Sequence, residues 1–244
     1  MSSKIQNEKV IIYFFIFSFI FTVLLGIKAN AQQTIFNVPT SDVLDTGKVY
    51  VELDASFKTN RENALGRFSS FVPRLVVGVG KDVEVGLNVT GNIQPGTDST
   101  TLVPAVKWRF YKNEKRGVAL FAGNHFYIPV RNRAYNFGSH TYIGGAKTFG
   151  KTRLTAAGYV ASKNVFAPNA VRGGGQFGFE HTVNKYLNIN ADWYTGKHAA
   201  GYFTPGVAFK PHPKVTGYFG YSIGNANAAQ GNHFFYAAIG WNIN

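Results

Sequence analysis

Cysteine is absent from the 244 residues of this chain. Its absence excludes disulfide scaffolds, zinc-thiolate sites and cysteine nucleophiles. It also suits an oxidising compartment, in which an unpaired thiol would be a liability. Acidic residues are scarce, because 12 Asp and Glu stand against 25 Lys and Arg, which gives a net charge of +13. A positive excess of this kind is compatible with nucleic acid, with anionic lipid, or with no particular partner.

Signatures of enzymes and metal sites are also missing. The motifs G-x-S-x-G, H-E-x-x-H and the P-loop do not occur. The six histidines are scattered, with no pair at the spacing of metal ligands. Glu180 and His181 would point to opposite faces of a strand, which makes them a poor acid–base pair. We therefore predict that the chain is not an enzyme and has no catalytic residue, metal or cofactor.

The N-terminus has the pattern of an export signal. Lys4 and Lys9 precede the apolar run Val10–Ile27, and the small-residue site Ala29-Asn30-Ala31 follows. A basic start, an apolar run and an A-x-A site together predict a secretory signal peptide over residues 1–31, with the mature chain beginning at Gln32. The alternative is a single transmembrane anchor, since the apolar run approaches the length that spans a bilayer.

Beyond this signal no segment reaches the ~20 apolar residues of a spanning helix. Apolar and polar residues alternate instead, as in 49–58 and 187–194, and such a period of two indicates strands with unlike faces. The 27 Gly, 22 Phe and 13 Tyr also suit strands and turns better than helices. We expect about twelve strands, near 48–58, 71–81, 83–93, 101–112, 117–129, 140–149, 152–162, 175–184, 186–196, 204–211, 214–224 and 233–244.

The connections between these strands alternate between short turns and longer loops. Outer-membrane barrels have an even strand number, short periplasmic turns and longer outer loops. The predicted fold is therefore all-β: a single antiparallel up-and-down transmembrane β-barrel of about twelve strands at 48–244, preceded by the cleaved signal peptide and by a periplasmic N-terminal segment at 32–47. A soluble secreted β-barrel binding protein is the less favoured alternative, because its outward faces would be charged.

The mature sequence resembles the bacterial outer-membrane β-barrel proteins. Phe36-Asn-Val-Pro-Thr-Ser-Asp-Val-Leu44, followed by Gly47, is similar to the lead-in of several uncharacterised porin-like barrels. The last twelve residues, HFFYAAIGWNIN, resemble the terminal strand that the barrel-assembly machinery recognises, although such strands usually finish on Phe or Trp and this chain ends on Ile243-Asn244. The resemblance implies an outer-membrane location in a Gram-negative cell, with membrane lipid and the assembly machinery as partners.

Charged residues on the polar faces are the candidates for a pore lining. Paired charges on wet walls would explain them, and so would a ring that selects solutes by charge. A row of inward tyrosines, with Tyr111 among them, would fill space or stack on sugar or nucleoside faces. The pore-lining candidates are Glu52, Asp54, Arg74, Glu84, Lys107, Arg109, Lys147, Arg153, Glu180, Asp192, Tyr194 and Lys210.

The excess of positive charge lies largely in the longer loops. A basic outer rim can bind the phosphates of lipopolysaccharide or can simply keep the loops soluble. The members of this rim are Arg61, Arg67, Arg131, Arg133, Lys163, Arg172 and Lys197. Nucleic acid is disfavoured as a partner, because a basic groove interleaved with aromatic residues is absent.

The function predicted from these features is a porin-like channel that passes small hydrophilic solutes passively with mild anion preference. The preference is expected from Lys107 and Arg109 on one face, with Lys147 and Arg153 on neighbouring strands. The alternative is a non-conducting structural or adhesive outer-membrane barrel, closed by its own side chains or by residues 32–47 folded inward.

Overall fold

The computed structural model describes residues 33–58, 68–90, 99–131, 133, 135–166 and 169–243. Almost all of them belong to strands or to the turns between strands. The strands are β1 (Val49–Lys58), β2 (Phe68–Gly80), β3 (Val83–Thr90), β4 (Thr100–Asn113), β5 (Val118–Arg131), β6 (Gly138–Phe149), β7 (Thr152–Ala161), β8 (Gly173–Thr182), β9 (Leu187–Tyr194), β10 (Tyr202–His212), β11 (Val215–Gly224) and β12 (His233–Asn242). A short 3₁₀ turn, η1 (Ala228–Gln230), precedes β12. Among the described residues, no helix is long and apolar enough to cross a membrane.

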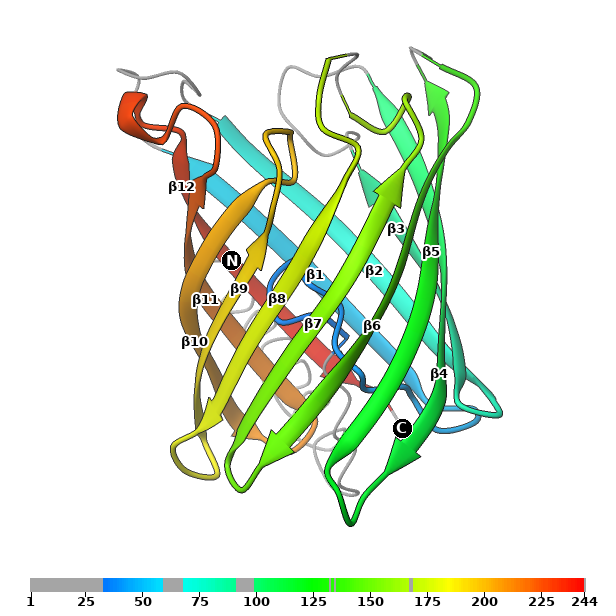
Figure 1. Ribbon diagram of the computed structural model, residues 1–244, viewed down its shortest axis with the longest axis vertical. Helices are drawn as coiled ribbons and strands as arrows, with labels where there is room; N and C mark the ends of the chain where they lie inside the picture. The colour runs from blue at the N-terminus through cyan, green and yellow to red at the C-terminus, as the bar shows by residue number, and fades with distance from the viewer. Residues whose placement is uncertain are drawn as a thin grey trace, which may run out of the picture.

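The twelve strands form one closed antiparallel barrel in which each strand pairs with its neighbours in sequence (Figure 1). Closure is made by β1 and β12, which pair from Tyr50 opposite Asn242 to Phe57 opposite Phe235. Because the sheet closes on itself, it has no edge strand with unpaired backbone groups. The all-β fold and the strand number predicted from the alternation are both confirmed. The predicted signal peptide at 1–31 lies outside the described residues.

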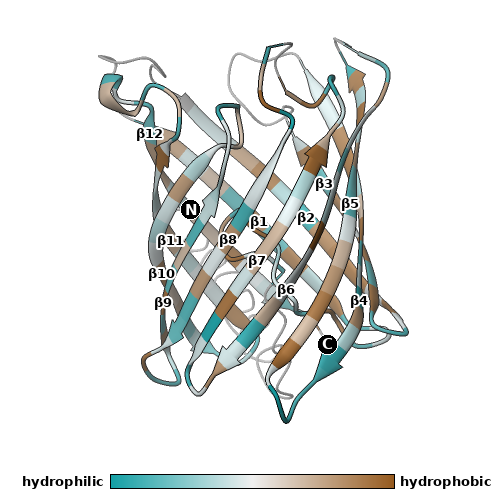
Figure 2. Cartoon of the chain, in the orientation of Figure 1, coloured by the Kyte–Doolittle hydropathy of each residue, from teal (hydrophilic) through white to brown (hydrophobic). Residues whose placement is uncertain are grey.

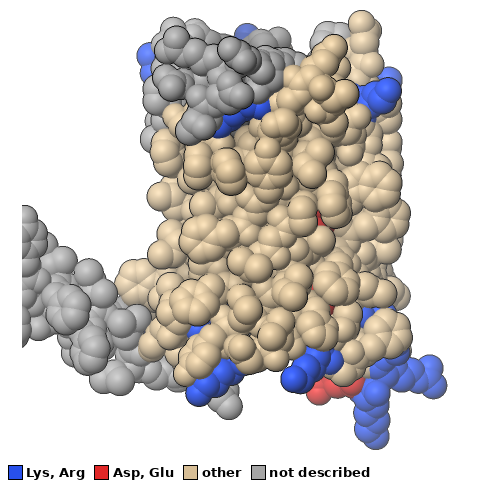
Figure 3. Space-filling model, turned by 90° about the vertical axis from the view of Figure 1, so that its left-hand side faces the viewer, with Lys and Arg blue, Asp and Glu red and all other residues tan. Residues whose placement is uncertain are grey.

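The two faces of the wall differ in polarity, as the alternation predicted. Outward side chains are apolar and exposed, with Ile143 61% and Val160 60% exposed. Inward side chains include Tyr50, Glu52 and Asp54, all buried. Apolar and polar residues alternate along the strands in Figure 2. On the face shown in Figure 3, Lys and Arg gather at the two ends of the barrel, and the band between them is almost free of charge.

Two local features of the wall were not predicted. A β-bulge between Trp108 and Tyr111 shifts the register of β4 against β5, and an extra residue in one strand turns the following side chains to the other face. Tyr111 consequently lies 43% exposed on the outside rather than in the lumen. In β5 the alternation could not be assigned from sequence, and the structure places Phe121 inward and Leu120 outward.

The largest departure concerns the residues ahead of β1. Residues 33–45, here called the inner segment, run inside the barrel, where Figure 1 shows them in blue. Thr34 pairs with Pro39, and the amide of Ile35 donates to the carbonyl of Val38 at 2.9 Å, so the segment begins with a tight turn. The periplasmic placement predicted for residues 32–47 is therefore corrected for residues 33–45, which lie inside the barrel. Its apolar side chains find burial in the lumen that a periplasmic extension would not offer.

Candidate functional site

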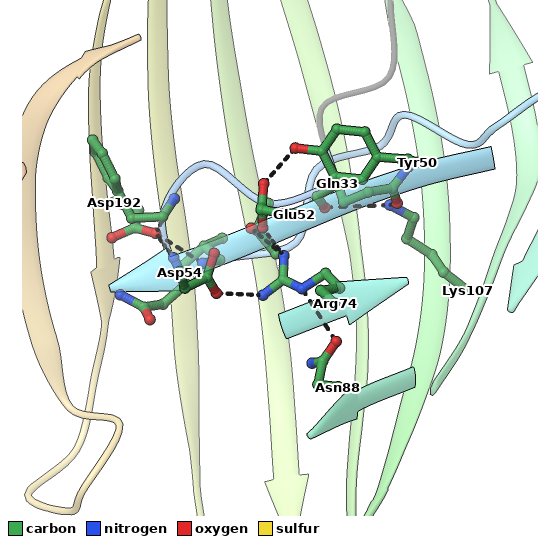
Figure 4. Close-up of polar contacts among 12 residues, drawn as sticks. Gln33, Tyr50, Glu52, Asp54, Arg74, Asn88, Lys107 and Asp192 are labelled. Atoms are coloured by element: carbon green, nitrogen blue, oxygen red, sulfur yellow. Dashed lines mark hydrogen bonds and ion pairs between the residues drawn. The ribbon is translucent and has the colours of Figure 1, made fainter. Parts of the chain in front are cut away.

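The lumen wall carries an ion cluster on β1 and β2. Arg74 lies within 2.7 Å of a carboxylate oxygen of Glu52 and 3.2 Å from one of Asp54 (Figure 4). Its Nε donates to Asn88 on β3 at 3.2 Å, and Tyr50 donates to the other oxygen of Glu52. Arginine provides a planar fork of donors that can serve two carboxylates together. The alternation of β1 places the two acids on one face, and the register of β2 brings the guanidinium opposite them.

A second ion pair joins β3 and β4. The Nζ of Lys107 lies 2.9 Å from a carboxylate oxygen of Glu84, and the two residues face each other directly in the sheet. Both side chains are buried, so the charges need partners in the low-dielectric lumen. The inner segment supplies additional ones: Lys107 donates to the side-chain oxygen of Gln33 at 3.1 Å, and the amide of Leu44 donates to Glu84 at 2.9 Å.

The third cluster lies toward the short turns. Arg153 on β7 binds Glu180 on β8, with Nη2 2.8 Å from one carboxylate oxygen. Its Nη1 lies 2.8 Å from both carboxylate oxygens of Asp42, which belongs to the inner segment. Lys210 on β10 lines the same part of the lumen. Each of these three clusters thus combines wall residues with at least one contact to the inner segment, since Arg74 also donates to Thr34 at 3.0 Å.

Asp192 on β9 binds the backbone of the inner segment directly. One oxygen of its carboxylate accepts three consecutive amides, from Phe36 at 3.0 Å, Asn37 at 2.6 Å and Val38 at 2.8 Å. Successive amides that point to one place form a concave site for an anion. Hydrogen bonds to a charged acceptor are also the strong ones. Asp192 is 1% exposed, so this anchor lies out of contact with solvent.

Glycines of the wall make room for the inner segment. A Cβ at Gly178 would lie 2.2 Å from the Cδ1 of Ile35, and one at Gly206 would lie 2.6 Å from the ring of Phe36. A Cβ at Gly78 would lie 2.5 Å from the carbonyl oxygen of Leu44. Only glycine permits so close an approach. The wall therefore has recesses whose shape matches the side chains and backbone of the inner segment.

Two cavities inside the barrel are lined by described residues. The loop-side cavity has a volume of about 210 Å³, and its lining includes Gln33, Thr34, Asn37 and Pro39 of the inner segment together with wall residues near the long loops. The turn-side cavity has a volume of about 470 Å³, and Asp42 is the residue that the inner segment contributes to it. The two share none of their described lining residues. The inner segment thus lies between two polar compartments.

An aromatic layer borders the loop-side cavity. The rings of His125 and His140 stack with centroids 5.6 Å apart, and His140 also contacts Tyr194, whose hydroxyl binds its Nε2. Farther toward the loops, the hydroxyl of Tyr159 lies 2.6 Å from the Nε2 of His198. Burial lowers the pKa of His198, a loop residue, below its ordinary value, which favours a neutral ring at pH 7.

The structure places eleven of the twelve pore-lining candidates on the inward face. Arg109 lies at the turn end, where it pairs with Asp82 of the β2–β3 turn. Tyr194 belongs to the aromatic layer rather than to a charged ring. Lys147 is the exception: it stands opposite Leu154 on the outward face, and its Nζ donates to the carbonyl of Arg116. Its inward assignment was wrong, and its long stem reaches from the apolar face to the rim.

Several lumen residues were missed by the sequence analysis. Asp42 and Gln33 precede the first strand and have no alternation that would assign them to a face. His140 and Tyr142 lie two residues apart on one face of β6, and the register of β5 against β6 brings His125 beside them. The inward glycines were a usable signal, since Gly178 and Gly206 occupy positions of the polar face where a side chain was expected.

The basic rim is partly described. Arg131, Arg133, Lys163, Arg172 and Lys197 are all exposed and lie at the end of the barrel with the longer loops. Arg61 and Arg67 lie outside the described residues. The five described residues thus have the exposure that binding of an external anion requires.

No protein-family model and no curated protein matches the chain. Similar solved structures include an outer membrane channel from Pseudomonas putida F1, which is 14% identical, with a TM-score of 0.48 over 83% of this chain and 97% of that chain. Outer membrane phospholipase A from Escherichia coli is 13% identical, with a TM-score of 0.46 over 83% of this chain and 94% of the enzyme. A porin from Rhodopseudomonas blastica is 11% identical, with a TM-score of 0.30 over 80% of this chain and 98% of the porin.

The backbone pairing and the polarity of the wall indicate where the barrel is located. Its backbone groups pair within a closed sheet, its exposed outward side chains are apolar, and its charges lie in the lumen and at the ends. Strands cross a bilayer in this form, because lipid offers no partner to an unpaired backbone group. The chain is a β-barrel of a bacterial outer membrane. A soluble secreted barrel would have its apolar faces inward, and here they point outward.

One prediction from the sequence is contradicted. We predicted that the chain is not an enzyme from the absence of familiar motifs. The phospholipase among the similar structures is an enzyme with the same twelve-stranded barrel fold. The motifs examined in the sequence therefore do not exclude catalysis for a barrel of this architecture, and that prediction was wrong.

Proposed function

We propose that this barrel is an outer-membrane channel for small hydrophilic solutes and that the inner segment holds it closed. The observation that carries the proposal is the position of residues 33–45 between two polar cavities of about 210 and 470 Å³. Walls lined by Arg74, Lys107 and Arg153 with their carboxylate partners suit water and hydrophilic solutes once the segment has left. The barrel lies among membrane lipid, and solutes would enter between the longer loops.

A mild anion preference belongs to the open state in this proposal. Arg74, Lys107 and Arg153 have carboxylate partners in the closed barrel, and Asp42 is one of the two partners of Arg153. The inner segment carries Asp42 and Asp45 and no Lys or Arg. Its departure would remove negative charge from the lumen and leave Arg153 with Glu180 alone. The open lumen would then be more positive than the closed one, and rings of charge decide which ions enter.

A structural or adhesive barrel is the second candidate. Val38 is fully buried and Ile35 and Phe36 are 1% exposed, as in an ordinary core. The recesses at Gly178 and Gly206 fit these side chains closely. Permanent filling of the lumen would require such packing. The two candidates differ in one property, which is whether the inner segment leaves the lumen.

A reversible cross-link separates these two functions. The chain has no cysteine, so Asn37→Cys with Asp192→Cys introduces a unique pair. The carboxylate of Asp192 accepts a hydrogen bond from the amide of Asn37 at 2.6 Å, so the two positions are close together, and a mobility shift on a non-reducing gel verifies that the disulfide forms. In a planar bilayer the oxidised barrel should show no openings, and reduction of the same sample should produce them. Because the two states share both substitutions, each serves as the control for the other.

Openings that are equal before and after reduction would contradict closure by the inner segment. Silence in both states, and also in a barrel from which residues 33–44 have been deleted, would favour the structural candidate. A heat-modifiable band on a gel verifies that each variant is folded. The truncated barrel keeps Asp45, which receives a hydrogen bond from Lys48 ahead of β1.

Two partners remain proposals. Binding of lipopolysaccharide phosphates at Arg131, Arg133 and Arg172 would use charge-assisted hydrogen bonds on the exposed rim. Insertion by the barrel-assembly machinery would use β12, whose Phe235, Ile239 and other outward residues form an apolar stripe. The first proposal predicts that vesicle binding is lost when lipopolysaccharide is removed from the vesicles. The second predicts that a chain truncated before β12 fails to insert.

A further inference from the structure

The loop-side cavity is lined both by aromatic rings and by hydrogen-bonding groups. His125, His140, Tyr142, Tyr194 and Phe166 contribute rings from β5, β6, β9 and the connection after β7. The rings of His125, His140 and Tyr142 lie with centroids 5.6–5.8 Å apart, which makes a continuous surface. Such rings offer flat faces that pack against the C–H groups of a ligand, while their polar atoms retain hydrogen bonds.

Hydrogen-bonding groups line the same cavity. Asn88 on β3 and Gln176 on β8 place amides at the cavity, and Gln33 and Asn37 of the inner segment add two more at its floor. His140 is 3% exposed, and its Nδ1 has no hydrogen-bond partner among the described residues. A buried polar atom without a partner is costly, and a ligand or water that binds it removes that cost.

The charges at the cavity are already paired. Arg74 binds Glu52 and Asp54 at 2.7 and 3.2 Å, and Lys107 binds Glu84 at 2.9 Å. An anionic ligand would have to displace a carboxylate, and a cationic one would have to displace Arg74 or Lys107. A neutral ligand with hydroxyl groups meets no such competition, because hydroxyls both donate to and accept from amides and imidazoles.

The volume limits the size of the ligand. A cavity of about 210 Å³ is large enough to hold several water molecules. One six-membered ring with its hydroxyls fits this space, and further rings of a chain would have to extend beyond it. From the aromatic rings, the amides, the paired charges and the volume, we propose that the loop-side cavity binds a single neutral polyhydroxylated ring, the size of a monosaccharide.

This proposal rests on the proposed channel function, because the ligand would be a solute of the same lumen. It also connects the ligand to the inner segment. Gln33, Thr34 and Asn37 are part of the floor, and Gln33 and Thr34 hold Lys107 and Arg74 respectively. A bound ring therefore contacts the segment that must leave before the solute can pass to the turn side.

Calorimetric titration of the refolded barrel with D-glucose tests the site. D-glucosamine and D-gluconate are probes of the same size with positive and negative charge, and maltotriose is a neutral probe of greater length. D-glucose should bind, and the other three should bind at least about tenfold more weakly. Gln176→Leu and Tyr142→Leu should each weaken D-glucose binding by about tenfold, the usual effect of losing one buried polar or aromatic contact.

Tyr218→Leu is the matched control, because Tyr218 is a buried lumen tyrosine that lines the turn-side cavity instead. It should leave D-glucose affinity unchanged, and Tyr142→Phe should keep most of it. Absence of D-glucose binding, equal affinity for D-gluconate, or wild-type affinity in folded Gln176→Leu would each overturn the proposal. Calorimetry measures binding independently of conductance, so the two proposals can fail separately. A barrel that conducts but does not bind D-glucose refutes the binding site and not the channel function. A barrel that binds D-glucose but never conducts refutes the channel function and not the binding site.

Discussion

The anchor at Asp192 allows the energy that holds the inner segment to be estimated. Asp192→Asn keeps the size of the side chain and removes the charge that three backbone amides share. A hydrogen bond to a charged group contributes ~1.5–3 kcal/mol, against ~0.5–1.5 kcal/mol for a neutral one. The difference is about 1 kcal/mol per bond. Because neighbouring bonds are not additive, we expect a total of about 1.5–2.5 kcal/mol rather than the full sum of about 3 kcal/mol.

An energy of this size corresponds to a change of roughly 10- to 100-fold in the ratio of released to inserted segment. The change is measured by labelling Ser41→Cys with a maleimide that does not cross membranes. Ser41 is buried in the closed barrel, and the chain has no other cysteine. Because the cysteine reacts only when the segment has left the lumen, its labelling rate is proportional to the population of the released state. The labelling rate of Asp192→Asn should therefore exceed that of the parent by roughly 10- to 100-fold.

Asp54→Asn is the control for this prediction. It removes a buried lumen carboxylate whose ion pair is with Arg74 of the wall, not with the backbone of the inner segment. Its labelling rate should change much less than that of Asp192→Asn. Equal rates in the parent and in folded Asp192→Asn would refute the reasoning, because three hydrogen bonds to one buried charge would then contribute nothing to closure.

Three further predictions concern the recess, the lumen charges and the lipid face. Gly178→Val should collide with Ile35 and raise the labelling rate at Ser41→Cys, whereas Gly178→Val with Ile35→Ala should restore the closed state. Lys107→Gln with Arg109→Gln should shift the reversal potential of the open channel toward cations, and Lys147→Gln should leave it unchanged because Lys147 faces outward. Phospholipids brominated on their acyl chains should quench the fluorescence of Trp108 and Trp193, which are 51% and 43% exposed on the outer face; unchanged emission would contradict the assigned faces.

The strands were predictable because their signal is local. Each one alternates over about ten residues, so Val49–Lys58 and Leu187–Tyr194 reveal both their limits and their faces without reference to the rest of the chain. Tyr111 is a residue whose face could not be predicted from local alternation. A bulge depends on the register in which β4 pairs with β5, and the alternation within one strand does not determine that register.

The lumen was predictable only in part. Inward charges were recognised from the polar faces, but their partners across the wall follow from register, as in Glu84 opposite Lys107. Lys147 was misassigned because its charge was taken as evidence of an inward position. Near the end of a strand, a lysine can face outward and still reach a polar rim. The face of a residue follows from its parity in the strand rather than from its charge.

The inner segment shows why strand number matters for function. Eight strands leave a lumen that side chains fill, and sixteen leave an aqueous channel. Twelve strands lie between these cases, and here Ile35, Phe36 and Val38 supply part of the filling. Such apolar burial alone would be costly to reverse.

The other contacts of the inner segment are of a different kind. Asp192, Arg153 and Lys107 hold the segment through charges, and water can solvate each charge once the segment has left. Exposing these groups to water costs far less than exposing an equal number of buried apolar side chains. A segment selected only to fill the lumen would have no need of polar anchors on three sides. The inner segment thus combines buried apolar side chains, Ile35, Phe36, Val38, Val43 and Leu44, with polar anchors on three sides, and it is these anchors that favour reversible closure over permanent filling.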